Sequence, residues 1–237
     1  MHQTVPQSGG GYAILMVAAI AVSAIYWFRR SKHDPLLLVV YIGALGGAFI
    51  GAKLAYIFAE IWFDWERPDF WLRLATGKSI LGGLLCGYAG VEIMKRLVGH
   101  SQSTGDAFAI ILPVGLILGR VGCWLHGCCL GKPVADSFML TLRDRAGGTR
   151  WPAVQVEMAF LLVMLAMILF WNWQGRFRDR LFFIFLTAYG LFRFAHEWLR
   201  DTPKWGGMIS GYQVIALAMA AIGAVMFTRR GRCGSFQ

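Results

Sequence analysis

Seven long runs of apolar residues constrain the fold of this chain more than any other feature. A helix that crosses a lipid bilayer needs about 20 mostly apolar residues, because no water there can hydrogen-bond an exposed backbone. The runs and their short connections take up nearly all of the 237 residues. The sequence therefore predicts an all-α polytopic membrane protein with about seven transmembrane helices. The predicted helices are residues 12–28, 35–63, 80–98, 107–125, 154–173, 181–199 and 208–227.

The composition leaves little room for a soluble domain. Apolar residues make up 57% of the chain and charged residues only 15%, whereas a soluble domain carries about 25% charged residues. We therefore expect residues 1–237 to form a single transmembrane domain. The first apolar run has no basic segment before it and no small-residue cleavage site after it, so it is predicted to be a retained helix rather than a signal peptide.

The basic residues gather in alternate connections between the predicted helices. The formal net charge of +10 would suggest nucleic acid on a soluble protein, but this distribution predicts membrane lipids and no nucleic acid as partners. Basic loops face the cytoplasm, which places the N-terminus outside and the C-terminus inside a bacterial inner membrane. The basic clusters are Arg29, Arg30 and Lys32; Lys95 and Arg96; Arg176, Arg178 and Arg180; Arg229, Arg230 and Arg232.

Two connections on the predicted outer side have distinctive compositions. Residues 64–79 contain Trp65 and Trp71, and tryptophan is typical of segments at the level of the lipid headgroups. Residues 131–152 form the longest connection and include a β-like stretch at 137–143. We expect this connection to be a periplasmic loop that caps the outer face.

Glycines recur at four-residue spacing in three of the predicted helices. In lipid, such positions let two helix backbones approach closely. We expect these glycines to serve helix packing. They are Gly43, Gly47 and Gly51; Gly83 and Gly87; Gly115 and Gly119.

Two arginines interrupt apolar helices at a similar depth. Arg120 and Arg193 both lie about 20 Å from the cytoplasmic edge of a hydrocarbon core that is about 30 Å thick. A charged group at this depth is costly and usually faces a partner or a cavity. The sequence therefore predicts that two separate helices deliver a guanidinium to the outer half of the membrane.

The helix that carries Arg193 has further polar residues on the same face. Tyr189, Arg193, Glu197 and Arg200 follow one another at helical spacing, so Glu197 is expected to pair with Arg193, and Glu157 is a second possible counter-ion. One interpretation is a buried salt-bridge network that fixes helix packing. The other is an anion site, because arginine binds phosphate bidentately and keeps its charge when desolvated. An anion inside the outer leaflet is most simply a phospholipid headgroup.

Three thiols and an imidazole lie close together after Arg120, at Cys123, His126, Cys128 and Cys129. They suit zinc or copper(I), although the paired C-x-x-C spacing of common zinc sites is absent. A second interpretation is a reactive thiol, because a nearby guanidinium lowers the pKa of a cysteine. A third is that the cysteines are small packing residues. The sequence leaves all three interpretations open.

Several of these stretches resemble the motifs of one enzyme family. Residues 119–131 read G-R-V-G-C-W-L-H-G-C-C-L-G, and residues 189–200 read Y-G-L-F-R-F-A-H-E-W-L-R. They are similar to G-R-x-G-N-x-x-N-G-E-x-x-G and Y-G-x-x-R-F-x-x-E-x-x-R of the prolipoprotein diacylglyceryl transferase family. Shorter matches cover the rest of the chain in order. These are Tyr12, Gly51-Ala52-Lys53, Arg150-Trp151-Pro152 with Glu157, and Ser210-Gly211-Tyr212-Gln213.

The resemblance implies a transferase. The family moves a diacylglyceryl group from phosphatidylglycerol to the thiol of a lipobox cysteine in a secreted preprotein, and glycerol phosphate leaves. It thus implies two partners, phosphatidylglycerol or a related phospholipid and a lipobox-containing preprotein, and it implies no cofactor and no metal. Arg120 and Arg193 are expected to clamp the phosphate, with Cys123, His126 and Cys128 as further catalytic candidates. The expected substrate-binding residues are Tyr12, Lys53, Gly131, Glu157, Tyr189, Glu197, Arg200 and Gln213.

The chain also departs from the family pattern. Leu81 stands where the family has a histidine, while Cys123 and Cys128 replace an asparagine and a glutamate. An acceptor thiol must lose its proton, which Leu81 cannot take up and His126 can. Two alternatives therefore stay open. One is a divergent member with another thiol acceptor or cysteine-based lipid transfer, and the other is a non-enzymatic lipid- or metal-binding membrane protein.

Overall fold

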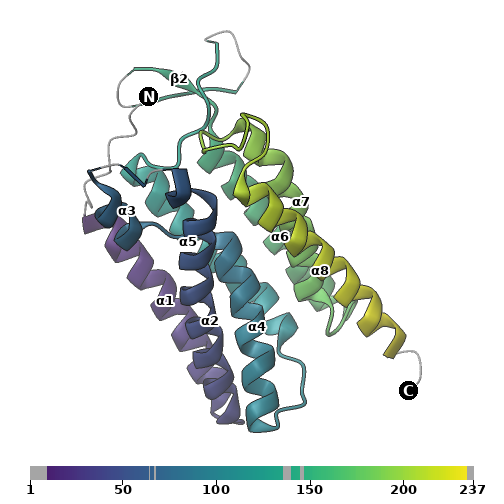
Figure 1. Ribbon diagram of the computed structural model, residues 1–237. Helices are drawn as coiled ribbons and strands as arrows, with labels where there is room; N and C mark the ends of the chain where they lie inside the picture. Colours follow the sequence, from purple (N-terminus) through teal and green to yellow (C-terminus); the bar gives the residue numbers. More distant parts are fainter. Residues whose placement is uncertain (1–9, 64, 67, 136–139, 145–146, 234–237) are drawn as a thin grey trace.

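The computed structural model is a bundle of long helices, and it describes residues 10–63, 65–66, 68–135, 140–144 and 147–233 (Figure 1). The long helices run along one common direction, and short elements lie at one end of the bundle. In chain order the elements are α1 (Gly10–Ser31), α2 (Leu36–Ala59), η1 (Ile61–Phe63), α3 (Phe70–Thr76), α4 (Ile80–Val98), α5 (Gly105–His126), β1 (Leu142–Arg143), β2 (Thr149–Arg150), α6 (Ala153–Trp173), α7 (Leu181–His196), η2 (Glu197–Leu199) and α8 (Gly211–Cys233).

Each predicted helix has a counterpart, and five helices in the described part of the chain are long and apolar enough to cross a membrane. These are α1, α2, α5, α6 and α8. The last turns of α4 carry Glu92, Lys95 and Arg96, and α7 has only 16 residues before the chain tightens into η2. The predicted run 35–63 is divided, because α2 ends at Ala59 and η1 follows. The chain is an all-helical, multi-pass membrane protein.

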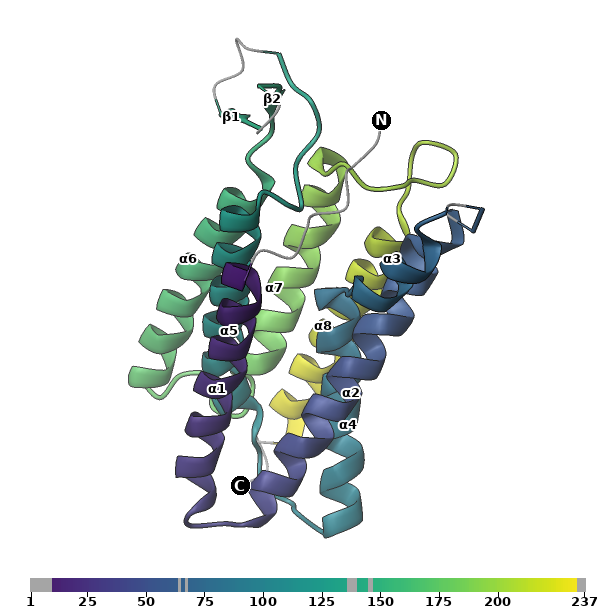
Figure 2. The same cartoon turned by 90° about the vertical axis from the view of Figure 1, so that its left-hand side faces the viewer.

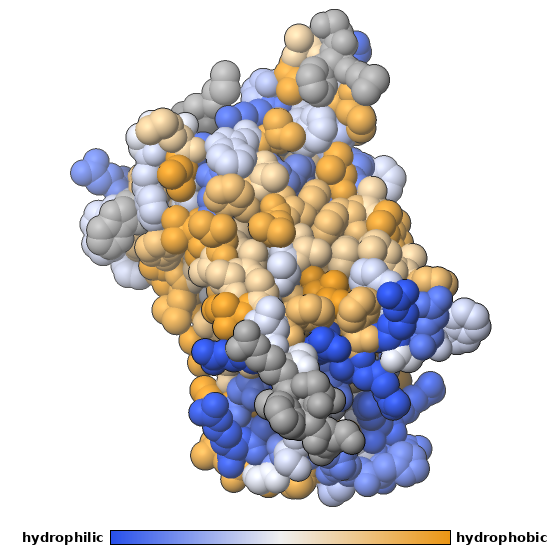
Figure 3. Space-filling model, turned by 90° about the vertical axis from the view of Figure 1, so that its right-hand side faces the viewer, coloured by the Kyte–Doolittle hydropathy of each residue, from blue (hydrophilic) through white to orange (hydrophobic). Residues whose placement is uncertain are grey.

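The two ends of the bundle carry different elements. The α1–α2 turn, the α4–α5 connection and the end of α8 lie at one end, whereas α3 and the β1–β2 hairpin lie at the other (Figure 2). On one face of the molecule, hydrophobic side chains form a band across the middle and hydrophilic ones gather at the lower end (Figure 3). The basic clusters therefore share one end of the bundle.

The hairpin lies in the predicted cap. β1 pairs with β2 in antiparallel register, with Leu142 opposite Arg150 and Arg143 opposite Thr149. The β-like stretch predicted at 137–143 is thus confirmed for its last two residues, while 137–139 lie outside the described residues.

Helices α2 and α4 approach each other closely, and glycines make this possible. A Cβ atom at Gly47 would overlap the carbonyl oxygen of Cys86, and one at Gly51 would overlap Gly82. The prediction that these glycines serve helix packing is therefore confirmed for α2. It was wrong for Gly115 and Gly119, where a Cβ would meet no atom within 4 Å.

The interior near the basic end is apolar and aromatic. Trp27 is fully buried and packs against Phe108, with ring centroids 4.4 Å apart, and against Tyr41 at 5.8 Å. A cavity of about 110 Å³ opens beside this cluster, between α2, α4, α5 and α7, and Lys95 and Arg230 contribute to its lining. None of the predicted site residues whose side chains are described lines it.

The α2–α4 contact predicts a position-specific effect of one methyl group. Replacing Gly47 with alanine forces the two backbones apart and should lower the free energy of unfolding by about 1–3 kcal/mol, as in overpacked cores. Gly46→Ala is the matched control, because a Cβ there has no neighbour within 4 Å. Thermal unfolding in detergent measures both, and equal melting temperatures for the two variants would contradict the packing described here.

Candidate active site

A buried carboxylate brings three helices together. Glu157 of α6 is fully buried, and one of its oxygens accepts hydrogen bonds from Arg120 Nη2 of α5 at 2.7 Å and from the Tyr189 hydroxyl of α7 at 2.6 Å. Its other oxygen accepts a bond from Arg193 Nη1 at 3.4 Å. The two predicted guanidiniums therefore meet at one carboxylate, and the prediction that Glu157 is a counter-ion is confirmed.

A second buried carboxylate, Glu197, extends the network. Arg193 Nη2 donates a hydrogen bond to Glu197 Oε2 at 3.0 Å, which confirms the predicted pair. Thr202 Oγ1 donates to Glu197 Oε1 at 2.7 Å. Arg200 lies beside both carboxylates, with Nε 3.6 Å from Glu197 Oε2 and Nη1 3.8 Å from Glu157 Oε2.

These groups, which we name the arginine cluster, carry an excess of positive charge. It consists of Arg120, Arg193 and Arg200 with Glu157 and Glu197, so three cations face two anions and one positive charge is left over. Four buried nitrogens have no hydrogen-bond acceptor among the described residues, namely Nε of each arginine and Nη1 of Arg200. Buried polar groups are normally paired. The arrangement is therefore suited to one more anionic acceptor.

Two residues that support this site, Thr202 and His196, were not predicted from the sequence. Thr202 lies in a connection without a motif, and its contact with Glu197 depends on how the chain turns after η2. His196 lies inside the Tyr189–Arg200 motif, but its partner comes from the predicted cap. Its Nε2 accepts a hydrogen bond from Trp151 Nε1 at 3.0 Å, which ties the cap to the end of α7.

Gln213, predicted to line the lipid site, lies at the start of α8. The Gln213 side-chain oxygen accepts a hydrogen bond from the Ser210 backbone N–H at 2.9 Å, and the Gln213 backbone N–H donates to Ser210 Oγ at 3.2 Å. This reciprocal pair is a capping box. Its amide nitrogen donates to the Phe194 carbonyl at 3.3 Å, so Gln213 joins α8 to α7.

Lys53, also predicted to bind substrate, has a structural role. Its ammonium group donates to the carbonyl oxygens of Leu74 and Ala75 at 2.6 Å each and of Gly77 at 3.0 Å. An ammonium group has three donors, so these bonds use all of them. Lys53 thereby holds the end of α3 on α2.

Gly131 and Tyr12 complete the predicted set. Gly131 pairs with Arg200 as a β-bridge, and a Cβ there would overlap the Trp151 carbonyl oxygen. A glycine therefore lets the cap approach the arginine cluster. Tyr12 lies in α1, but its side chain is outside the described residues.

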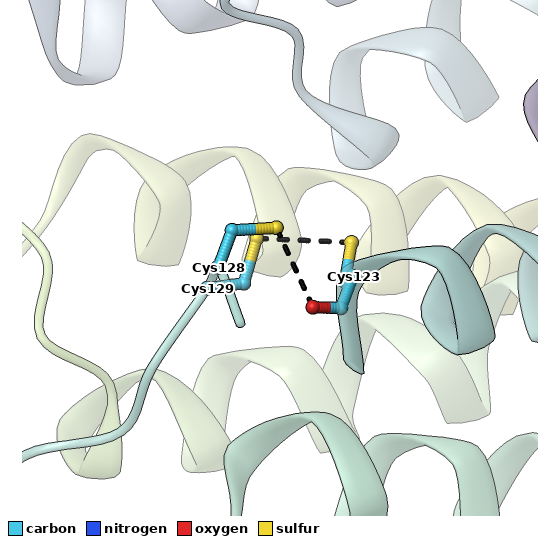
Figure 4. A group of neighbouring side chains, drawn as sticks. All are labelled: Cys123, Cys128 and Cys129. Atoms are coloured by element: carbon cyan, nitrogen blue, oxygen red, sulfur yellow. Dashed lines mark hydrogen bonds between the residues drawn. The ribbon is translucent and has the colours of Figure 1, made fainter. Parts of the chain in front are cut away.

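The three cysteines come together where α5 ends. Gly127 adopts a left-handed conformation with φ of 74° and stops the helix. The Cys128 N–H then bonds to the Cys123 carbonyl at 3.1 Å, as in a Schellman motif. The Sγ atoms of Cys123, Cys128 and Cys129 all lie within 4.8 Å of one another (Figure 4). His126 ends α5 and is not part of this sulfur group.

The surroundings of Cys129 lower the pKa of its thiol. Hydrogen bonding with the Cys123 and Cys128 thiols lowers the pKa of the Cys129 thiol, against the opposing effect of burial. The guanidiniums of Arg200 and Arg120 lower this pKa further. The predicted lowering of a thiol pKa beside a guanidinium is thus confirmed for Cys129 alone among the three cysteines.

Comparison with known proteins decides the family. The family model described as prolipoprotein diacylglyceryl transferase matches residues 8–229. The chain belongs to this family. Among the family's phosphatidylglycerol–prolipoprotein diacylglyceryl transferases, that of Clostridium tetani is 27% identical, over 92% of this chain and 91% of its own length. That of Methylococcus capsulatus is 30% identical, over 91% and 88%. No solved structure matches the chain.

Membership of the prolipoprotein diacylglyceryl transferase family confirms the resemblance, and the chain is a transferase. Within this family, the departure at Leu81 has a clear structural consequence. Leu81 is 1% exposed and lies in the apolar core, so no proton acceptor stands at that position.

The arginine cluster predicts that Glu157 stabilises the bundle. Replacing Glu157 with glutamine leaves three guanidiniums with one carboxylate, and removing one partner of a buried pair costs about 3–5 kcal/mol. Glu92→Gln is the matched control, because Glu92 faces Arg230 at 4.0 Å with both side chains 31% exposed, and such pairs contribute at most about 1 kcal/mol. Thermal unfolding of both variants in the same detergent measures the difference. Equal losses of melting temperature would contradict the stabilising role of Glu157.

Proposed function

We propose that this chain transfers a diacylglyceryl group from phosphatidylglycerol to the thiol of a lipobox cysteine in a preprotein and releases glycerol phosphate. The observation that carries the proposal is the arginine cluster, with three cations against two anions and four buried donors that have no acceptor in the described part of the chain. The relatives compared above are named phosphatidylglycerol–prolipoprotein diacylglyceryl transferases. The phospholipid and the preprotein are thus the proposed partners.

The excess charge argues against a purely structural network. An unpaired charge inside a membrane protein is costly, and a network that served only helix packing gains most when its charges balance. A phosphodiester carries one negative charge, which matches the excess of the cluster. The carboxylates and Tyr189 would then hold the guanidiniums in place before the substrate arrives.

The reaction makes one bond and breaks one. The acceptor sulfur forms a C–S bond to the terminal glycerol carbon of the diacylglyceryl group, while the C–O bond from that carbon to the phosphate breaks. The electron pair stays on the phosphate oxygen, and the leaving group gains negative charge. Arg120, Arg193 and Arg200 would stabilise that charge, and pre-positioned donors in a site without water are most effective for this purpose.

The thiol proton needs an acceptor. Leu81 is apolar and buried, so we propose His126, half-buried at the end of α5, as the base. Cys123 and Cys128 replace polar family residues, but a covalent step on them is unproductive, because a cysteine alkylated by the lipid would hold it in a stable thioether. The neighbouring thiols would therefore shape this end of the site without carrying the lipid.

We also propose that α4 and α7 cross the membrane with the other five helices. α4 packs along α2 and α7 packs along α8 over most of their lengths, and the basic clusters share one end of the bundle. That end would face the cytoplasm of a bacterial inner membrane. Residues 131–152 would cap the periplasmic end, beside the arginine cluster that Gly131 contacts through Arg200, and residues 1–237 would form one transmembrane domain.

The proposed phosphate site predicts that charge alone is insufficient at Arg120. Arg120→Lys keeps the cation but loses the planar fork that binds phosphate bidentately, and we expect kcat to fall about 100-fold or more, as when one transition-state donor is removed. Arg230→Lys, at the basic end of the bundle, is the control. Transfer of labelled diacylglyceryl from phosphatidylglycerol to a lipobox peptide in proteoliposomes measures both. Undiminished turnover by a folded Arg120→Lys variant would refute the phosphate clamp.

The proposed orientation predicts the behaviour of reporter fusions. A green fluorescent protein fused after Gln237 should fluoresce, whereas alkaline phosphatase at the same place should be inactive, because that enzyme is active only outside the cytoplasm. Alkaline phosphatase fused after Gly147, in the proposed periplasmic cap, should be active. The reverse pattern at the two positions would show that the chain lies in the membrane the other way round.

A further inference from the structure

The proposed transfer leaves the group of three thiols at the end of α5 without a chemical role. Cys123 is buried and its Sγ lies 3.9 Å from Cys129 Sγ. Cys128 completes the group, and its Sγ lies 3.7 Å from the Cys123 carbonyl oxygen. The sulfur atoms converge on one point between the helix end and the chain that follows it (Figure 4).

The sulfurs lie close enough for one metal ion, and two of them have nearly the spacing of metal ligands. Zinc–sulfur bonds of about 2.3 Å place two sulfurs of a tetrahedral site roughly 3.8 Å apart. A disulfide requires about 2.05 Å between its sulfurs. The 3.9 Å between Cys123 and Cys129 therefore matches two ligands of one ion and is far from a covalent bond.

The backbone conformation after α5 brings the three sulfur atoms together. Gly127 and Cys129 both have left-handed conformations, with φ of 74° and 60°. For a residue with a side chain this conformation is unfavourable. At Cys129 it turns the thiol back toward the end of α5, which simple packing of a small side chain does not require.

A small cavity beside the thiols leaves room for a fourth ligand. It measures about 30 Å³ and is lined by all three cysteines together with Arg150 and Trp151. One water needs roughly 10–15 Å³ of such space. Three protein ligands and a water are a common arrangement for zinc.

The nearby charges are suited to a metal–thiolate complex. Three thiolates around a divalent ion carry one net negative charge, and around a monovalent ion two. Arg120 and Arg200 lie close enough to act electrostatically on Cys129. Glu157 and Glu197 already balance most of the positive charge of these arginines, so they offset only part of the charge on the complex.

We propose that Cys123, Cys128 and Cys129 form a three-thiolate site for a soft metal ion, zinc(II) or copper(I), at the outer end of α5. Both ions prefer thiolate ligands. The site would tie the last turn of α5 to the start of the cap, and its existence does not depend on the proposed transferase reaction.

Metal binding to the purified full-length protein tests the proposal. The reduced protein is exposed without oxygen to zinc(II) or to copper(I), desalted, and analysed for metal by mass spectrometry. We expect about one tightly held ion per chain in at least one of the two arms. The variant C123S/C128S/C129S should hold none, while Cys86→Ser, which alters a thiol between α2 and α4, should bind like the unaltered chain.

A second measurement needs no variant and so does not depend on whether the triple variant folds. The bound ion should slow alkylation of the three cysteines in the unaltered protein, and a chelator should restore the rate. Equal metal content in the unaltered and triple-variant chains overturns the proposal. So does alkylation that neither ion slows, or a disulfide between two of the three cysteines in protein exposed to metal.

Discussion

The carboxylate of Glu157 is the interaction on which the rest of the site depends. It is fully buried and receives hydrogen bonds from Arg120 of α5 and from Tyr189 and Arg193 of α7. Two guanidiniums side by side in an apolar interior repel one another strongly, because the low dielectric of the interior leaves their charges unscreened. A carboxylate from a third helix removes this repulsion and fixes both guanidiniums at one place. Helix packing and the proposed phosphate site therefore use the same contacts.

The packing of the other helices determines where this network lies. Glycines bring α2 and α4 into backbone contact, and aromatic residues around Trp27 fill the basic end of the interior. The paired carboxylates and guanidiniums of the arginine cluster lie at the opposite end, next to the cap. Gly131 and Trp151 then join the cap to Arg200 and His196. The site lies where three helices and one loop meet, and the proposed phospholipid and preprotein would have to reach it there.

The chain combines family features with an unusual end of α5. The arginines, Glu157 and the Tyr189–Arg200 motif agree with the prolipoprotein diacylglyceryl transferase family to which it belongs. Leu81, Cys123 and Cys128 do not, and the three thiols lie together instead of being dispersed. The sequence lacks the C-x-x-C spacing of common zinc sites, which argued against a metal site. That spacing describes ligands that lie in one regular loop. Here the left-handed turn at Gly127 folds two cysteines back on a third, an arrangement that depends on the conformation of two residues.

The sequence by itself determined the helical membrane architecture, the alternation of basic loops and the pairing of Arg193 with Glu197. Each follows from the length of an apolar run, from local charge or from helical periodicity, which are properties of neighbouring residues. Only the tertiary structure decided that Gln213 caps α8, that Lys53 holds α3, that Thr202 supports Glu197 and that three sulfurs converge. These contacts join residues from different elements or depend on a single turn. Their geometry is set by how the helices pack, which local sequence patterns do not encode.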